Sequence, residues 1–547
     1  MTADILFTGG TVRTMDPARP RVDAVAVAGG RIAAVGAEAD VLAMAGPRTR
    51  RIDLHARTLL PGFQDAHVHP SMAGIGLLRC PLHDVPATPD DYLRVIRDYA
   101  DAHPDDEWIE GDGWYMSAFP GGTPTAADLD RAVADRPAYF DNRDGHGAWV
   151  NSAALARAGI TAETPDPPHG RIERDADGNP TGTLHEGAAE LVNRLIPSPT
   201  PEDRVKGLEL GQAYLQRLGI TAWQDAWVTE PELDAYITFA ERGLLTGRAV
   251  ACHWWDRDQG LEQIESLIAR RARSRVGRLT AGTVKIMQDG VAENFTAAML
   301  HPYVGPDGAP TANRGLSFVE PELIKRAVTE LDALGFQVHF HALGDRAVRE
   351  ALDAVEAALR KNGPTDGRHH LAHLQIVDPL DWPRFNALNA TANIQPFWAC
   401  TDEQMTELTL PFLPPERAAL QYPFRSLLRA GARLAGGSDW TVSTPNVMAE
   451  IAVAVSRVCE EDRSAEPFIP SEALTLEDAL AAFTHGSAYV NHLDAVTGTI
   501  EVGKLADLVV LDRDLDHLDG TPLGDVQVLL TLIEGEAVFE AGELESA

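Results

Sequence analysis

The feature that most constrains the fold is an alternation of short apolar segments and amphipathic segments through the middle of the 547-residue chain. The apolar segments have the length of buried strands, and stretches such as 322–334 and 346–359 have the apolar spacing of helices. The strand candidates are residues 58–69, 220–226, 248–254, 283–288, 337–341, 370–375, 392–396 and 433–437. Eight strand-helix units predict an α/β protein built on a (β/α)8, TIM-like barrel.

The two ends of the chain have a different pattern, with short β-like runs punctuated by glycines. We expect segments 1–58 and 491–547 to pair into one small β-sandwich domain, with the barrel at 59–490 between them. Roughly 150 residues separate the first two strand candidates, far more than an ordinary loop, so an insertion is expected at about 71–217. Because it would emerge at the catalytic face of the barrel, it should form a lid or a pocket wall.

The composition argues against several classes of function. A formal net charge of −34 argues against nucleic acid as a partner, because phosphates are bound through clustered Lys and Arg. No apolar run approaches the ~20 residues that span a bilayer, and the first residues lack a basic start followed by an apolar core. Cys80, Cys252, Cys400 and Cys459 share no C-x-x-C spacing. We therefore expect no membrane partner, and reduced thiols in a cytoplasmic protein.

Histidines stand at the ends of three strand candidates. His67 and His69 follow an apolar run, and because residues i and i+2 of a strand share a face, their imidazoles can bind one ion together. His339 and His341 form a second such pair, of which one need bind a metal while the other supports it by a hydrogen bond.

The third histidine-bearing strand end is at residues 368–375. His373 lies furthest toward the end of this candidate, while His369 and His370 are expected to be polar surface residues or supports for a ligand. A lone strand histidine is more often structural than metal-bound. Three histidine-bearing strand ends in one barrel favour a metal site instead.

Two further residues add to this set. Lys285 lies inside an apolar strand. There it either extends its charged end to water, pairs with Asp289, or is a neutral amine that CO2 converts to a carbamate able to bridge two cations. Asp439 follows the last strand candidate, where it either caps a helix or takes a proton from a metal-bound water.

Taken in order, these motifs resemble those of the amidohydrolase superfamily, and of its YtcJ-like branch, which includes the N-substituted formamide deformylases. The resemblance covers nearly the whole chain. It departs from the commonest pattern at Ala372, where a glutamate often precedes the histidine, and at Gln288, which bears on substrate preference rather than catalysis. The matching pieces are 61–69, 284–285, 289–290, 341–347, His373 and 438–439, with 144–146, 150–155 and 178–186 in the insertion.

This resemblance implies a binuclear centre of two Zn²⁺ ions per chain. His67 and His69 would hold the more buried ion, and His341 and His373 the more exposed one. Carboxylated Lys285 would bridge the two ions. Asp439 would bind or hydrogen-bond the bridging hydroxide and act as general base, then as general acid. Relatives are often dimers or larger, which makes a homodimer the expected assembly.

These features predict a zinc-dependent hydrolase that cleaves the C–N bond of an amide, formamide or cyclic amide with a metal-activated hydroxide. An esterase or lactonase could use the same site. A deaminase with one metal usually lacks the bridging lysine, and a non-catalytic scaffold would have lost ligands. A small-molecule substrate is expected in each enzymatic case.

Substrate contacts are less well defined by the sequence. Trp114 and Trp398 are two of several tryptophans near strand ends or in the insertion, where they could line an apolar pocket, although packing is the commoner role. His146 and Asp289 are the other candidates for substrate binding. Without clustered arginines, a phosphate or multiply anionic substrate is not expected.

Overall fold

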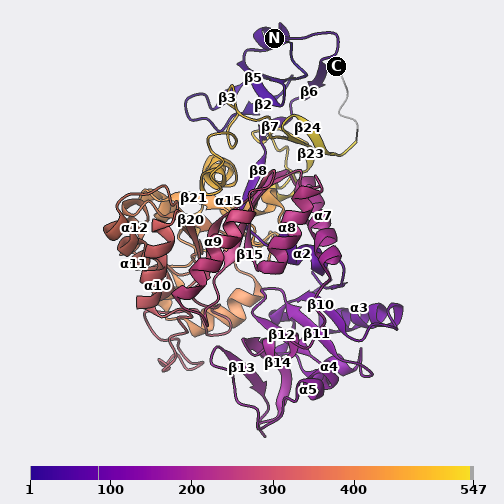
Figure 1. Cartoon of the computed structure of the whole chain (residues 1–547), viewed down its shortest axis with the longest axis vertical. Coiled ribbons are helices and arrows are strands. Elements are labelled where there is room, and N and C mark those ends of the chain that lie inside the picture. Colours follow the sequence, from indigo (N-terminus) through magenta and orange to yellow (C-terminus); the bar gives the residue numbers. More distant parts are fainter. Residues whose placement is uncertain (1, 84, 543–547) are drawn as a thin grey trace.

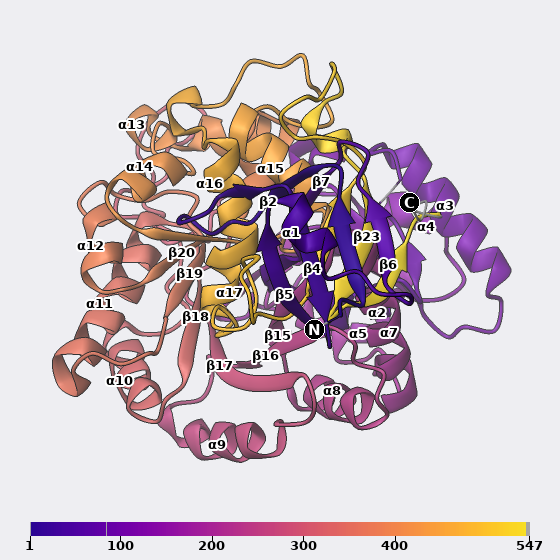
Figure 2. The ribbon, with the colours of Figure 1, turned by 90° about the horizontal axis from the view of Figure 1, so that it is seen from above.

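The centre of the computed structural model, which describes residues 2–83 and 85–542, is an eight-stranded parallel sheet. Its strand order is β21-β20-β19-β18-β17-β16-β15-β8, which is the chain order, and each predicted strand segment contributes one strand. The TIM-like barrel is thereby confirmed (Figures 1 and 2). The strands are β8 (Phe63–Val68), β15 (Ile220–Val228), β16 (Arg248–Trp254), β17 (Leu279–Met287), β18 (Gln337–Ala342), β19 (His370–His373), β20 (Thr391–Ile394) and β21 (Arg433–Gly436).

The barrel closes between its last strand, β21, and its first strand, β8, through hydrogen bonds made by the backbone that follows β21. The Asp439 N–H donates to the His67 carbonyl at 2.7 Å, and the His69 N–H donates to the Trp440 carbonyl at 2.8 Å. A Cβ on Gly437 would lie 2.6 Å from the Cβ of His67, so only glycine permits this approach. The join therefore places the last strand end directly beside the first pair of histidines.

Helices cover the outside of the barrel, with α8 (Glu230–Glu241), α9 (Ile264–Arg273), α10 (Pro321–Ala333), α11 (Asp345–Asn362) and α12 (Trp382–Ala387) around the strands in Figure 2. In α10 the buried residues Ile324, Val328 and Leu331 recur at helical spacing and face the sheet. The helix begins after Glu320, whose side chain accepts the Leu323 N–H.

The first predicted strand, 58–69, is two strands rather than one. Strand β7 (Thr58–Pro61) belongs to another sheet, and β8 begins after the single residue Gly62. A Cβ on Gly62 would lie 2.4 Å from Cγ2 of Thr221. The apolar run continues through both strands, so the break results from pairing partners and close packing rather than from a change of composition.

Strands from the two ends of the chain are neighbours outside the barrel, at the top of Figure 1. In the larger of the two sheets there, Leu59 of β7 lies opposite Val510 of β22 in antiparallel pairing. That sheet contains β24 (Glu536–Glu540), β23 (Val528–Ile533), β22 (Leu508–Leu511), β7, β2 (Thr11–Arg13) and β3 (Arg21–Val22), and the smaller one β5 (Arg31–Gly36), β4 (Ala24–Ala28), β1 (Ile5–Thr8) and β6 (Arg50–Asp53). The sheets share a hydrophobic cluster that includes Phe7, Val27 and Val510.

The long segment between β8 and β15 forms a sheet of its own, on the opposite side of the barrel from the terminal strands (Figure 1). Helix α3 (Pro89–Ala102) packs its buried face, including Leu93 and Ile96, into the same cluster as Phe140. The sheet contains β13 (Gly170–Arg174), β14 (Pro180–Glu186), β12 (Gly147–Val150), β11 (Ala138–Asn142), β10 (Ile109–Trp114) and β9 (Cys80–Pro81), in that order.

The prediction that all four cysteines are reduced is wrong. Cys400, after β20, and Cys459, after helix α15 (Val447–Ser456), form a disulfide, while Cys80 and Cys252 are free and buried. The two half-cystines are 59 residues apart, and only the fold brings their loops together. Disulfides are rare in cytosolic proteins, so the cysteines no longer support a cytoplasmic location.

Within residues 2–83 and 85–542, no helix combines the length and the apolar character needed to span a lipid bilayer.

Candidate metal centre

The C-terminal ends of the barrel strands surround a cavity of about 710 Å³ whose outer wall comes from the insertion. Active sites of such barrels lie at this end of the strands. All six side chains predicted as metal ligands line this one cavity: His67, His69, Lys285, His341, His373 and Asp439.

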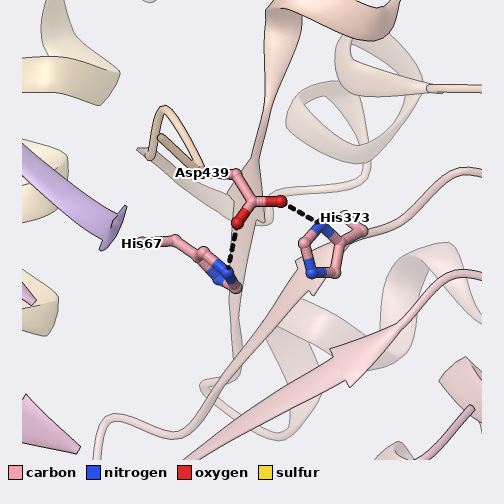
Figure 3. A group of neighbouring side chains, drawn as sticks. All are labelled: His67, His373 and Asp439. Atoms are coloured by element: carbon pink, nitrogen blue, oxygen red, sulfur yellow. Dashed lines mark ion pairs between the residues drawn. The ribbon is translucent and has the colours of Figure 1, made fainter. Parts of the chain in front are cut away.

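Three of the six lie within the reach of one ion. Asp439 Oδ1 is 3.1 Å from His67 Nε2, and Asp439 Oδ2 is 3.7 Å from His373 Nδ1 (Figure 3). One ligand atom from each of these residues lies within 4.8 Å of the others. The carboxylate therefore stands between imidazoles carried by the first and the sixth barrel strands.

The other two histidines lie against this group. His69 Nε2 donates to Asp439 Oδ1 at 2.9 Å, and His69 also precedes helix α2 (Pro70–Gly76). The His341 and His373 rings are 4.3 Å apart, edge to face. His341 Nε2 also donates to the Gly290 carbonyl at 3.4 Å.

The backbone at two of these positions is strained. Asp439 has φ +54° and His373 has φ +77°, in the left-handed region that residues other than glycine rarely adopt. The strain at Asp439 is held by its neighbour Ser438, whose hydroxyl and N–H both donate to the buried Asp65. Such strain persists where surrounding contacts fix it, and it is common at functional sites.

Burial sets the charge of these groups. It lowers the pKa of His67, His341 and His373 well below the ordinary value, so the imidazoles are neutral and can act as ligands. For Asp439 burial acts to raise the pKa, but the hydrogen bond from His69 and the nearby His373 outweigh it and the pKa is lowered. The Asp439 carboxylate thus faces the neutral imidazoles of His67 and His373.

Lys285 is fully enclosed, and burial lowers its pKa from 10.5 to about 7. Its Nζ and both ring nitrogens of His373 are buried without a hydrogen-bond partner among the residues that the structure describes. Unpaired buried polar atoms are costly unless something else binds them. Imidazole and carboxylate donors with a neutral amine fit a divalent transition metal.

His339 does not enter the cavity but supports a residue that does. Its Nε2 and the Nδ1 of His67 share a hydrogen bond of 2.8 Å. His369 and His370, by contrast, are not surface residues. His369 is buried against Asp332 at 3.1 Å, and His370 against Gln224 at 2.9 Å.

The four candidate substrate contacts differ in whether they line a cavity. His146 and Trp398 line the cavity, and Trp398 stacks on His373 with ring centroids 5.6 Å apart. Trp114 lines a second cavity, of about 410 Å³, that shares Trp398 with the first. Asp289 lines neither cavity, because its carboxylate is fully buried and accepts the N–H groups of Ala298, Leu343 and Gly344, which argues against direct contact with substrate.

Sequence reasoning assigned no role to two further residues that line this cavity, Glu186 and Trp227. Glu186 accepts from His146, and Trp227 stacks on Trp254 with centroids 4.2 Å apart at the ends of β15 and β16. The signal that could have identified Trp227 is its position directly after the strand candidate 220–226, two residues beyond the polar residue Asp225. Asp225 itself is a structural residue, since it is fully buried and accepts from Tyr236 at 2.8 Å.

Comparisons with known proteins agree with this geometry. The chain is 29% identical to the N-substituted formamide deformylase of Arthrobacter pascens, over 98% of each protein, and 28% identical to the putative amidohydrolase YtcJ of Bacillus subtilis, over 98% of this chain and 99% of that one. An uncharacterised metal-dependent hydrolase from Pyrococcus furiosus is 25% identical, with a TM-score of 0.71 over 93% of this chain and 99% of that one. Residues 50–539 match the amidohydrolase family. The chain is therefore a member of the amidohydrolase family, and a hydrolase.

Proposed function

We propose that this hydrolase is zinc-dependent and cleaves the C–N bond of an amide, a formamide or a cyclic amide. The observation that carries the proposal is the convergence of four histidines, a buried lysine and an aspartate on one cavity at the catalytic end of the barrel. The relative from Arthrobacter pascens is a formamide deformylase, which supports a C–N bond as the target.

The residues of the cavity suit two ions. His67 and His69 would hold the more buried ion and His341 and His373 the other, with Lys285 bridging them as a carbamate. A neutral amine is the form that reacts with CO2, and burial of Lys285 favours that form. A divalent cation bound here would polarise a carbonyl oxygen and lower the pKa of a bound water from ~15.7 toward ~7.

Asp439 is placed to move a proton. Its carboxylate is ionised and lies beside both His69 and His373, so it can accept a proton from the attacking water. It can then give that proton to the departing nitrogen, which an amide needs because an amide anion is a poor leaving group. We propose Asp439 as general base and then general acid.

One observation supports a narrower alternative. His67, His373 and Asp439 together lie within reach of a single ion, as in a site for one metal that serves a deaminase. Lys285 on the wall of the same cavity favours the two-ion arrangement, because its buried amine has no hydrogen-bond partner among the described residues 2–83 and 85–542. An esterase or lactonase would use the same residues, so only a substrate screen distinguishes these activities from hydrolysis of a C–N bond.

Metal analysis of the purified chain tests the proposal. We expect close to two zinc ions per chain, and Lys285→Ala should lower that content and abolish turnover. Lys325→Ala changes a surface lysine on α10 and serves as the matched control, with unchanged metal and activity. One metal ion per chain in both the wild type and Lys285→Ala would favour the deaminase alternative. A wild-type protein without bound metal would contradict the proposal.

The substrate screen should contain N-alkyl formamides, N-acyl amino acids and lactams, with matched esters and lactones. Turnover of amides that stops with a chelator and returns with zinc is the expected result. Turnover confined to the esters and lactones would show that the enzyme cleaves a C–O bond and not the proposed C–N bond.

A further inference from the structure

The second cavity, of about 410 Å³, adjoins the one that contains the proposed metal ligands. Trp398 lines both cavities and stacks on the proposed ligand His373, with ring centroids 5.6 Å apart. A volume of this size is typical of small-molecule pockets. A substrate bound at the metal centre therefore has a second space beside it. The residues common to both walls are Arg143, Asp144, Val291, Leu343, Trp398 and Val442.

Much of the second cavity is lined by aromatic and other apolar side chains. Trp114 and Tyr115 come from the insertion, and Phe397, Trp398 and Met405 come from the segment after β20. Aromatic rings bury apolar groups, and their faces also attract ammonium groups. The lining suits an occupant with an apolar body.

Tyr422 is a buried polar side chain in this lining that has no partner. It is 3% exposed, and its hydroxyl makes no hydrogen bond among the described residues 2–83 and 85–542. Its backbone is held at φ +48° by two contacts, since its N–H donates to the Gln375 carbonyl at 2.7 Å and its carbonyl accepts from Nη1 of Arg457 at 3.1 Å. A bulky residue rarely adopts this left-handed conformation, and such strain is common at functional sites. A buried hydroxyl held in this way points to a ligand in the cavity.

Acidic groups line the same cavity from its interior to the solvent. Glu293, in the loop after β17, is half-buried and accepts from the Thr409 hydroxyl at 2.7 Å, but it forms no ion pair with any described residue. Burial raises the pKa of Glu293 to about 7, and the nearby Asp144 and Asp402 add to this effect. The acidic residues that line the cavity and are exposed are Asp402, Glu403, Glu461 and Asp462.

Arg143 is the one positive group among the described residues of this wall. It donates to the carbonyls of Val442 at 2.9 Å and His83 at 3.0 Å, and its guanidinium lies 4.6 Å from the centre of the Tyr115 ring. These contacts hold it at the boundary with the first cavity, which it also lines. Negative charge is left in excess, so the second cavity favours a cation over an anion.

We propose that the second cavity binds a basic substituent of the substrate, with an apolar body against the aromatic rings and a protonated amine near Glu293, Asp402 and Tyr422. An ammonium group has three hydrogens to donate, and carboxylate and phenol oxygens accept them. A cation bound here would also pair the charge of Glu293. The inference rests on the proposed hydrolysis and names its substrate class: an amide or formamide whose apolar substituent ends in an amine.

The first experiment measures the binding of three probes to the metal-loaded full-length chain. Phenethylamine, phenethyl alcohol and phenylacetate have the same apolar ring and carry a cation, no charge and an anion at its end. We expect phenethylamine to bind roughly tenfold more tightly than phenethyl alcohol, because its hydrogen bonds join charged groups. Isothermal titration calorimetry at neutral pH measures the three affinities.

Substitutions then locate the bound amine. Glu293→Gln and Tyr422→Phe change side chains that line the second cavity and not the first. Glu293→Gln should weaken phenethylamine roughly tenfold and leave phenethyl alcohol and the metal content unchanged, and Tyr422→Phe should weaken the amine less. Glu407→Gln is the matched control, because it removes the same charge from an exposed residue of the segment after β20 that lines neither cavity.

The second experiment measures turnover of two formamides of equal length. One is a diamine with a single formylated nitrogen, and the other is the matching formylated amino alcohol. The wild type should have the higher kcat/KM for the first compound. Glu293→Gln should raise KM for that compound roughly tenfold at unchanged kcat and leave the alcohol unaffected. A residue needed only for folding would change both compounds equally.

Three outcomes overturn the inference. These are equal affinity of the wild type for phenethylamine and phenethyl alcohol, equal loss of amine affinity in Glu293→Gln and Glu407→Gln, and preference for phenylacetate that Arg143→Gln removes at unchanged metal content. The last result would assign the cavity to an acidic substituent.

Failure of the proposed function gives a different result. A chain that binds phenethylamine through Glu293 yet hydrolyses no amide or formamide would contradict C–N cleavage and leave the cation site standing. Hydrolysis of neutral formamides without any preference for basic ones would support C–N cleavage and overturn the inference.

Discussion

His339 and His67 share a hydrogen bond between Nε2 of the first and Nδ1 of the second, 2.8 Å long, in the interior of the barrel. The bond fixes the plane of the His67 ring and leaves Nε2 directed at Asp439, 3.1 Å away. A histidine that seems redundant beside His341 therefore has a role in orienting another strand's imidazole.

This relationship predicts an effect on metal affinity. His339→Leu removes the hydrogen bond and should weaken metal binding by roughly 10- to 100-fold, as loss of such supporting residues does. His339→Gln can place its amide oxygen near the same point, where it accepts from Nδ1–H of His67, and should retain most of the affinity. Competition with a chelator measures both. Equal affinity in the two variants would show that the hydrogen bond does not position His67.

The disulfide between Cys400 and Cys459 determines how many free thiols the protein should have. Denatured under non-reducing conditions, the protein should expose two thiols, Cys80 and Cys252, and four after reduction. Cys400→Ser should lower the stability by about 2–4 kcal/mol, because the crosslink restricts the unfolded chain. Colorimetric thiol titration and thermal unfolding check the two parts. Four thiols before reduction would rule the bond out.

The buried His253 predicts a pH dependence of stability. Burial lowers its pKa from 6.5 to about 4 in the folded chain. As pH falls through this window the unfolded state takes up the proton first, so its contribution to stability is lost from pH 6.5 down to about 4. The full loss is roughly 3 kcal/mol.

The matched variant for this test is His253→Gln, which keeps a donor for the Ala281 carbonyl that His253 Nε2 contacts at 3.1 Å. The difference in unfolding free energy between wild type and variant should be constant above pH 6.5 and should shift in favour of the variant below it. A difference that does not vary between pH 4 and 7 would contradict the assignment.

An ion pair joins the barrel to the terminal strands. Arg248 of β16 pairs with Asp507, which precedes β22, and with Glu534 at 2.5 Å. The Asp507 side chain is 2% exposed and that of Glu534 36% exposed. Asp507→Asn leaves the buried guanidinium poorly compensated and should cost about 3–5 kcal/mol, measured by urea unfolding. Glu534→Gln should lower the free energy of unfolding by less than about 1 kcal/mol. Equal losses of unfolding free energy in the two variants would contradict a larger role for the buried pair.

The barrel could be predicted because its information is local. Each strand segment is a short apolar run, and the metal-site candidates stand where those runs end, so barrel topology alone brings His67, Lys285, His341 and His373 to one rim. Strand ends are a property of the sequence, whereas the contacts between loops are not.

What could not be predicted depends on distant partners. Cys400 and Cys459 meet only because two loops fold over one cavity, and Glu186 reaches His146 across 40 residues of the insertion. Asp289 looks like a polar residue at a strand end, yet its carboxylate is occupied by three backbone N–H groups, one from later in its own loop and two from the loop after β18. Residue type alone does not distinguish such an acceptor from a substrate ligand.

The single residue between β7 and β8 has a consequence for synthesis of the chain. His67 and His69 are made early, but the strand that leads into them through Gly62 has β22 as its antiparallel neighbour, at Leu508–Leu511. Domains fold as units once their segments have left the ribosome. The first two proposed ligands can therefore reach their final positions only when the last part of the protein has been translated.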